Sequence, residues 1–188
     1  MSQPQRRVVQ RETYAAFLRA VNVGGTGIVS MAAIKQALDQ LGLVDVRTYL
    51  NSGNVIFSGP GLDEAKMATR IEKAIEQRTG FAANVLVLSR AALKKVVEAI
   101  PVGWVDDKQM RCYVLLLWKE VDDRTILRQI PSKPEIEDLK YVPGAVIWRI
   151  DRKNLSKSRF TRIIGTPLYK QITIRSANTV RKLNDLTT

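Results

Sequence analysis

The segment Arg19-Ala20-Val21-Asn22-Val23-Gly24-Gly25-Thr26-Gly27 joins a predicted strand to a predicted helix. The apolar run 14–18 precedes it, and a helical pattern that starts at Ser30 follows it. A strand that leads into a glycine-rich turn and a helix start is an arrangement in which backbone N–H groups can converge on an anion. The segment therefore predicts the first strand-to-helix connection of the fold and a candidate anion site.

Working outward from this segment, residues 13–100 alternate between strand and helix patterns. Apolar residues between 31 and 41 recur at helical spacing, which predicts a helix that begins after Ser30 and ends near Gly42. Two strand-like runs, 46–50 and 55–58, flank a turn at 51–54 whose Asn and Gly residues favour a β-hairpin. The remaining predicted elements of this part are a helix at 63–78, a strand at 83–88 and a helix at 89–100.

A similar order recurs after residue 110. The predicted strands are 112–119, 136–141, 145–150 and 171–174, and the predicted helices are a short one from Asp122 or Asp123, one at 156–164, and a last one capped by Ser176. We therefore predict an α+β fold that duplicates two ferredoxin-like β-α-β-β-α-β(α) halves packed as one compact unit. The predicted parts are a flexible basic arm at 1–12, a first half at 13–100, a linker at 101–110 and a second half at 111–188.

The charge of the chain is concentrated at its two ends. The 188 residues carry a net charge of +12, and residues 140–188 hold eleven basic and two acidic side chains. Such a field attracts nucleic acid or nucleotides, although basic side chains also serve simply as solvated surface. No apolar run approaches membrane-spanning length and no signal peptide is recognisable, so we expect a soluble, cytoplasmic protein with no membrane partner.

The sequence contains one cysteine and no histidine. Ser-His and Cys-His nucleophile systems and the usual zinc sites are thereby excluded, and Asp, Glu, Lys and Tyr are the candidates for proton transfer. Cys112 lies in an apolar run, where an inert buried thiol is expected. We expect no metal site and no cofactor.

Three motifs, at residues 17–25, 48–57 and 173–183, resemble the bacterial proteins grouped as domain of unknown function 1697. The resemblance runs from about residue 13 to 186 and implies a compact chain of two ferredoxin-like halves, without an assigned activity. The chain departs from that pattern where Ala20 stands in place of a usual Gly and Leu88 in place of a common Arg. Ser176-Ala177 replaces an Asn-Trp pair, which removes an aromatic ring from the closing motif.

Polar residues cluster at strand ends and turns in three places, and a basic segment forms a fourth cluster. The planar Arg guanidinium can bind a phosphate or carboxylate through two hydrogen bonds, and the Asn amide offers both a donor and an acceptor. Gly lets the backbone approach a ligand closely. Each cluster also has a structural interpretation, as a turn, a hairpin tip, a helix cap or a solvated basic turn. The candidate ligand-binding or anion-binding residues are Arg19, Asn22, Gly24, Gly25, Asn51, Ser52, Asn54, Ser156, Lys157, Arg159, Arg175, Asn178 and Lys182.

Three functional hypotheses follow. The first is binding of an anionic partner, nucleic acid or a nucleotide, through a basic C-terminal face and a polar pocket. The second is an enzyme acting on a small phosphorylated or carboxylated substrate, with a carboxylate such as Asp45 or Asp151 as base. The third is a protein-interaction adaptor. The three Trp residues are expected in or near the core rather than as stacking platforms, and nothing in the sequence indicates an oligomeric state.

Overall fold

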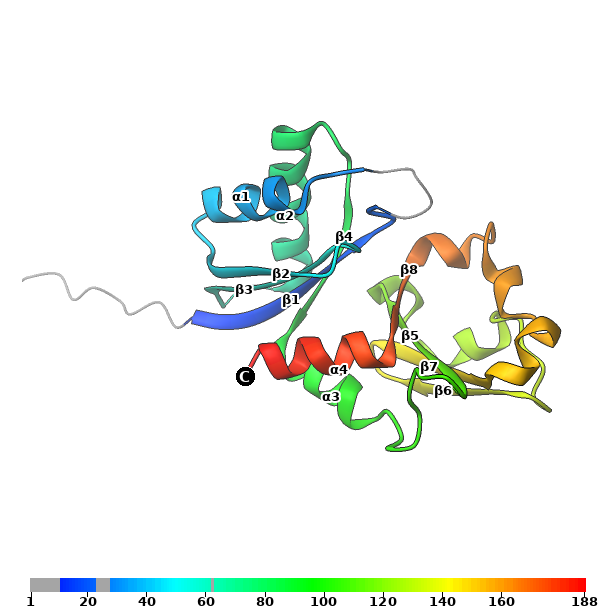
Figure 1. Ribbon diagram of the computed structural model, residues 1–188. Helices are drawn as coiled ribbons and strands as arrows, with labels where there is room; N and C mark the ends of the chain where they lie inside the picture. Colours follow the sequence, from blue (N-terminus) through cyan, green and yellow to red (C-terminus); the bar gives the residue numbers. More distant parts are fainter. Residues whose placement is uncertain (1–10, 23–27, 62) are drawn as a thin grey trace, which may run out of the picture. The chain divides into compact units, whose positions relative to one another are not determined.

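The computed structural model describes residues 11–22, 28–61 and 63–188, which fold as two compact units that divide between Arg90 and Ala91 (Figure 1). Each unit contains a four-stranded antiparallel sheet with helices, so the protein is an α+β chain. Within the described ranges, every helix is too short or too polar to cross a membrane.

The first unit alternates strands and helices as the sequence predicts. Its elements are β1 (Arg11–Arg19), α1 (Met31–Gln40), β2 (Val44–Tyr49), β3 (Asn54–Pro60), α2 (Glu64–Thr79) and β4 (Asn84–Ser89). The strand order across the sheet is β2-β3-β1-β4. Strand β1 starts at Arg11, so two residues of the predicted basic arm are in the sheet, and residues 1–10 lie outside the described ranges.

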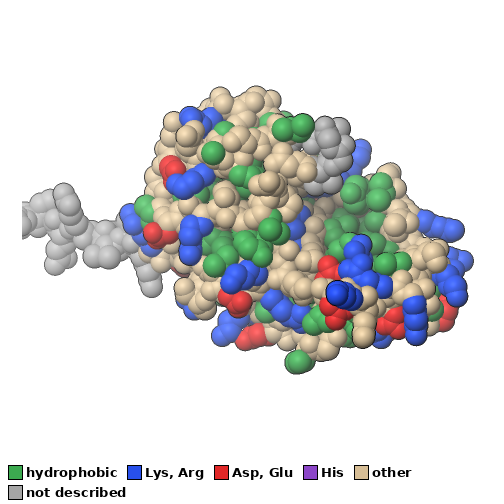
Figure 2. Space-filling view, viewed as in Figure 1, with side chains coloured by type: hydrophobic (Ala, Val, Ile, Leu, Met, Phe, Trp, Pro, Cys, Tyr) green, Lys and Arg blue, Asp and Glu red, His purple; other side chains and the backbone are tan. Residues whose placement is uncertain are grey.

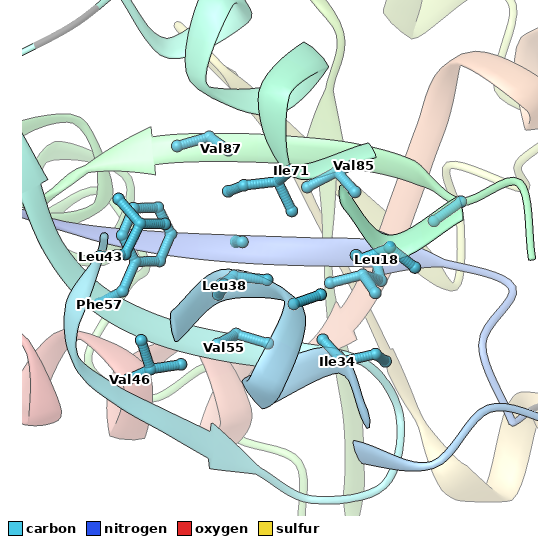
Figure 3. Packing of buried hydrophobic residues seen from close by; sticks show 14 of the residues in the cluster. Leu18, Ile34, Leu38, Leu43, Val46, Val55, Phe57, Ile71, Val85 and Val87 are labelled. Carbon is cyan, nitrogen blue, oxygen red and sulfur yellow. The ribbon is translucent and has the colours of Figure 1, made fainter. Parts of the chain in front are cut away.

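The core of the first unit forms where α1 and α2 pack against the sheet (Figure 3). Leu38 of α1, Ile71 of α2 and Phe57 of β3 are fully buried there. The Phe57 ring stacks on Tyr14 of β1 with a centroid distance of 5.5 Å. The helical spacing of the apolar residues therefore places them on the core side, as predicted.

Local capping explains where α2 begins and ends. The Asp63 carboxylate accepts hydrogen bonds from the backbone N–H groups of Ala65 and Lys66. Gly80 ends the helix with φ +70°, a left-handed conformation that glycine adopts without steric cost. Ser30 occupies the cap position of α1, but its side chain makes no capping bond.

The second unit contains longer connections than the first. Its helices and strands are α3 (Arg90–Glu98, which begins at the division), β5 (Met110–Leu117), β6 (Glu137–Val142), β7 (Ala145–Asp151), β8 (Ile172–Ser176) and α4 (Ala177–Leu186). The strand order is β6-β7-β5-β8. Short 3₁₀ helices connect them, at Lys119–Val121, Arg124–Arg128, Arg152–Lys157, Phe160–Ile163 and Leu168–Gln171.

The α-helix predicted at 156–164 is wrong. This part of the chain forms two 3₁₀ helices that are separated at Ser158, whose backbone is extended (φ −60°, ψ 145°). The Ser158 hydroxyl donates to the Glu137 carboxylate and accepts from the backbone N–H of Phe160. A serine that bonds locally in this way competes with helical backbone bonds, which accounts for the break.

The two sheets share one strand order: second, third, first, fourth within each unit. The sequence predicted the β-α-β-β-α-β order of elements along each half, and made no prediction of the strand order across the sheets. The connections differ between the units, however. In the first unit α1 connects β1 to β2 and α2 connects β3 to β4, whereas 3₁₀ helices make the corresponding connections in the second unit. The duplication of one ferredoxin-like half therefore stays a prediction.

Candidate functional site

Asn22, a candidate ligand-binding residue, uses its side chain to join two loops of the first unit. Its amide nitrogen donates to the backbone oxygens of Val29 and Asn51, at 3.0 and 2.9 Å. Its amide oxygen accepts from Val29 N–H at 2.9 Å. Asn22 itself is in the left-handed region, with φ 53°. These bonds hold the β1–α1 connection against the β2–β3 hairpin, so Asn22 has a clear structural role.

The tip of the β2–β3 hairpin is likewise held by internal bonds. The side-chain nitrogen of Asn54, which is 0% exposed, donates to Tyr49 O at 3.0 Å and to the Ser52 hydroxyl at 3.1 Å. Gly53 O accepts from Leu18 N–H at 2.7 Å. Two of the predicted polar clusters thus meet in space, and their amide groups bond mainly to the protein backbone.

The other candidates in the first unit are Arg19, Gly24 and Gly25. Arg19 ends strand β1, is partly buried and pairs in register with Asn84 of β4. Gly24 and Gly25 lie outside the described residues, so the proposed anion site in the glycine-rich turn stays a prediction.

The polar cluster after strand β8 belongs to the second unit. The Asn178 side chain donates to Asp106 O at 2.7 Å, which fastens helix α4 to the loop before β5. Arg175 lines a cavity, and burial lowers its pKa to about 10. Its guanidinium donates to the Thr173 hydroxyl and to Ile174 O. Lys182 is exposed on α4.

The basic segment 152–171 presents several cations to solvent. It contains six basic residues and no acidic residue, and Lys153, Lys157, Arg159, Arg162 and Lys170 are exposed. Ser156 is also exposed within the 3₁₀ helix Arg152–Lys157. The α-helix whose N-terminus was expected to favour an anion is replaced here by 3₁₀ helices, so the anion site at these residues stays a prediction. Figure 2 shows Lys and Arg side chains on the second unit beside hydrophobic surface.

A cavity of about 380 Å³ in the second unit brings aromatic residues and arginines together. Its floor is one face of the sheet, where Tyr113 of β5 lies between Trp148 of β7 and Ser176 of β8 in register. Its wall is the segment 155–169, which supplies Leu155, Ser158, Phe160, Thr161, Ile163, Ile164 and Tyr169. A mostly apolar cavity of this size with a few polar groups is typical of small-ligand sites.

The aromatic rings of the cavity form a packed cluster. Phe160 stacks on Trp148 with a centroid distance of 4.3 Å, and Trp148 stacks on Tyr113 at 5.5 Å. Trp148 and Phe160 are buried, whereas Tyr113 and Tyr169 are partly exposed and line the cavity. Ile164, 62% exposed, adds apolar surface at the wall. The cavity is therefore lined largely by aromatic and aliphatic side chains.

Arg111 supplies positive charge at the cavity. Its guanidinium lies 5.4 Å from the centre of the Tyr113 ring, a cation–π distance. Its Nε is 3.7 Å from Asp106 Oδ1, and Asp106 also pairs with Arg152 at 3.0 Å. Arg111 is thus oriented by Asp106 while its side chain lines the cavity.

Of the predicted site residues, Arg175 alone lines this cavity; Arg111, Tyr113, Trp148, Phe160 and Tyr169 were missed. Alternation along a strand is a signal that could have placed Arg111 and Tyr113 on one face, but no local pattern shows that Trp148 lies beside Tyr113. That juxtaposition depends on the register of β5 against β7. Trp148 is a core residue, as expected, and it also lines the cavity.

The comparisons with known proteins agree with this fold. The family model described as "Protein of unknown function (DUF1697)" matches residues 11–148. The chain belongs to this family. A solved structure, described as that of conserved bacterial protein SP0830 from Streptococcus pneumoniae, is similar with a TM-score of 0.80 and 27% identity. The match covers 95% of this chain and 100% of that one. A search of curated proteins finds no significant match.

The residues matched by the family model include only part of the cavity lining. Arg111, Tyr113 and Trp148 of the floor lie inside the matched residues, whereas the wall segment 155–169 and Arg175 lie after them. Among the described residues, no group of three His, Cys, Asp or Glu side chains is placed to hold a metal ion.

Proposed function

We propose that this member of the family binds a nucleotide unit, one base with its phosphate, in the cavity of the second unit. This nucleotide is either free in solution or part of a single-stranded nucleic acid. The observation that carries the proposal is the combination of aromatic rings and arginines around one cavity of about 380 Å³. Such a protein would act in the cytoplasm, where we expected it.

The ring surface supports binding of a base. Tyr113 and Tyr169 are partly exposed at the cavity, and every nucleobase has a flat face that can stack on such rings. Stacking of one base on an aromatic side chain contributes about 1–3 kcal/mol and depends little on base identity. A volume of about 380 Å³ is at the small end of ligand pockets, which suits a single base rather than several.

The charges support binding of phosphate. Arg111 lies at the cavity itself, and the exposed Lys157, Arg159 and Arg162 lie on the segment that forms its wall. A single mononucleotide needs few cations, whereas a strand passes several phosphates along such a segment. The number of exposed cations therefore favours a single strand over a free nucleotide.

The test is a binding titration of the purified, nuclease-treated chain with labelled single-stranded DNA and RNA and with mononucleotides, over a salt series. The variant Lys157→Gln/Arg159→Gln/Arg162→Gln should reduce the salt slope for a strand by about two, since each phosphate contact contributes about 0.7. The matched control is Lys66→Gln/Arg70→Gln/Lys73→Gln, which removes the same charge from exposed positions on α2.

A single strand and a free nucleotide should behave differently in this titration. A strand should bind more tightly than a mononucleotide and lose that advantage in the wall variant, whereas binding of a free nucleotide should not change in the wall variant. The proposal fails if neither ligand binds at low salt, or if the control variant weakens binding as much as the wall variant does.

We also propose that both units are versions of one ferredoxin-like half. Their identical strand order supports this, and the different connecting helices weigh against it. Superposition of the two sheets, strand for strand, tests it.

A further inference from the structure

The outer end of the Arg111 guanidinium is accessible at the cavity. The Arg111 side chain is 32% exposed, and its guanidinium lies 5.4 Å from the centre of the Tyr113 ring, which also lines the cavity. Its Nε is buried and has no hydrogen-bond partner among the described residues. The two Nη atoms have no hydrogen bond there either, but they are not buried, so they can donate to a ligand.

Arg175, the other arginine that lines the cavity, is held by the protein itself. Its guanidinium donates to the Thr173 hydroxyl at 2.9 Å and to Ile174 O at 2.8 Å. Burial also lowers the pKa of Arg175 to about 10, because the charged guanidinium is largely removed from water. Of the two arginines, Arg111 is therefore the one whose terminal donors are available to an anion.

Asp106 holds the inner end of the Arg111 guanidinium. Its Oδ1 lies 3.7 Å from Arg111 Nε and 3.0 Å from Arg152 Nη2. The Asp106 side chain is only 18% exposed, so water screens these ion pairs incompletely. Two arginines share this one carboxylate, so the group keeps one positive charge. An anion can approach the Nη atoms of Arg111 while its Nε stays beside Asp106.

The loop that carries Asp106 is itself fixed by hydrogen bonds. The Asn178 side chain donates to Asp106 O at 2.7 Å and accepts from Asp106 N–H at 3.4 Å. The Asp107 carboxylate accepts from the backbone N–H groups of Gln109 and Met110, each at 2.8 Å. The position of the Asp106 carboxylate is thus set before a ligand arrives, which lowers the entropic cost of binding.

We infer that the Nη atoms of Arg111 bind the phosphate of the ligand and that Asp106 is a positioning residue for this arginine. The inference rests on the proposed function and deepens it. Two guanidinium N–H groups match two oxygens of one phosphate, so one accessible guanidinium accounts for one phosphate beside the bound ring. Asp106 therefore has two opposite effects: its charge repels the phosphate, whereas its contact with Nε orients the group that binds it.

Adenosine and adenosine 5′-monophosphate (AMP) test the first part of the inference. The two probes share the base and the sugar and differ in the phosphate. Calorimetry on the whole chain should show that AMP binds about 10- to 100-fold more tightly, the range expected for hydrogen bonds to a charged group. Arg111→Gln should remove most of this preference and leave adenosine binding unchanged.

Asp106→Asn tests the positioning role. If Asp106 acted through its charge alone, removing the carboxylate would strengthen AMP binding. A positioning role instead predicts that the variant binds AMP about 3- to 10-fold more weakly and adenosine as tightly as the wild type does. The matched control is Asp138→Asn, which removes a carboxylate paired with Arg149 at 2.6 Å; neither residue lines the cavity, so the AMP preference should persist.

The outcomes separate the inference from the proposed function. The inference is overturned if the AMP preference survives Arg111→Gln, or if Asp106→Asn strengthens AMP binding or weakens both probes equally. In each case nucleotide binding itself still supports the proposed function. Strand binding without AMP binding overturns the inference if Arg111→Gln does not weaken it. If neither probe and no strand binds, both are overturned.

Nuclear magnetic resonance on the wild-type chain keeps the test decisive if a variant does not fold. The side-chain ¹H–¹⁵N resonance of Arg111 Nε should shift on addition of AMP and much less on addition of adenosine. A resonance that AMP leaves in place while AMP binds overturns the inference.

Discussion

Replacing Asn22 with Ala tests whether the polar residues of the first unit hold the fold together. The change removes two donated hydrogen bonds and one accepted hydrogen bond between the amide and the backbone of Val29 and Asn51. It also leaves Ala at φ 53°, a left-handed conformation in which Asn is tolerated better than Ala.

The expected loss of unfolding free energy is estimated from these hydrogen bonds and from the backbone conformation. Each hydrogen bond contributes about 0.5–1.5 kcal/mol net, and the left-handed backbone adds about 1 kcal/mol. Water replaces part of the bond to Asn51, because that bond is exposed. We therefore expect Asn22→Ala to lower the free energy of unfolding by about 2–4 kcal/mol.

Urea unfolding followed by far-UV circular dichroism measures this change. Tryptophan fluorescence reports the second unit separately, because all three Trp residues follow residue 90. Asn51→Ala is the matched control, since Asn51 contributes its backbone oxygen to the network; its unfolding free energy should change by about 0.5 kcal/mol or less. An Asn22→Ala variant as stable as the wild type, but impaired in ligand binding, would refute the structural role.

Three further predictions concern single positions. Gly53→Ala should destabilise the protein by more than about 1 kcal/mol in urea unfolding, because φ is +75° and the new Cβ would lie 2.8 Å from Leu18 Cβ; an unchanged midpoint would contradict this. Ala20→Gly should stabilise by about 0.5–1 kcal/mol, since Ala20 has φ 57°; a loss of stability would contradict it. Burial raises the pKa of Cys112 from 9.0 to about 11, so the native thiol should resist a disulfide reagent that labels the unfolded chain completely. Because the folded pKa is the higher one, this thiol's contribution to stability is complete below pH 9.0 and is lost as the pH rises towards about 11, and Cys112→Ala should abolish that dependence.

Local signals in the sequence were sufficient for the first unit. The spacing of apolar residues identified α1 and α2, and the Asn-Ser-Gly-Asn turn identified the β2–β3 hairpin. The departure at Ala20 also has a physical meaning, because the position has positive φ, for which Gly is the usual residue.

Local sequence patterns could not predict the cavity. Its rings come from β5, β7 and two separate 3₁₀ helices, and only strand register and the path of the connecting segment bring them together. The break at Ser158 was also hidden, because it depends on a bond to Glu137, which is distant in sequence. Strong matches to the family pattern at Asn22 and Asn54 identified residues that hold loops together and not the residues that line the cavity.

The floor and the wall of the cavity are built from different kinds of structure. The floor belongs to a hydrogen-bonded sheet, of which strands β5, β7 and β8 line the cavity, whereas the wall consists of short 3₁₀ helices in the connection between β7 and β8. Substitutions in a surface connection disturb stability less than substitutions in sheet strands. Substitutions at exposed wall positions, such as Thr161 and Ile164, should therefore change the lining of the cavity with little effect on the sheet that forms its floor.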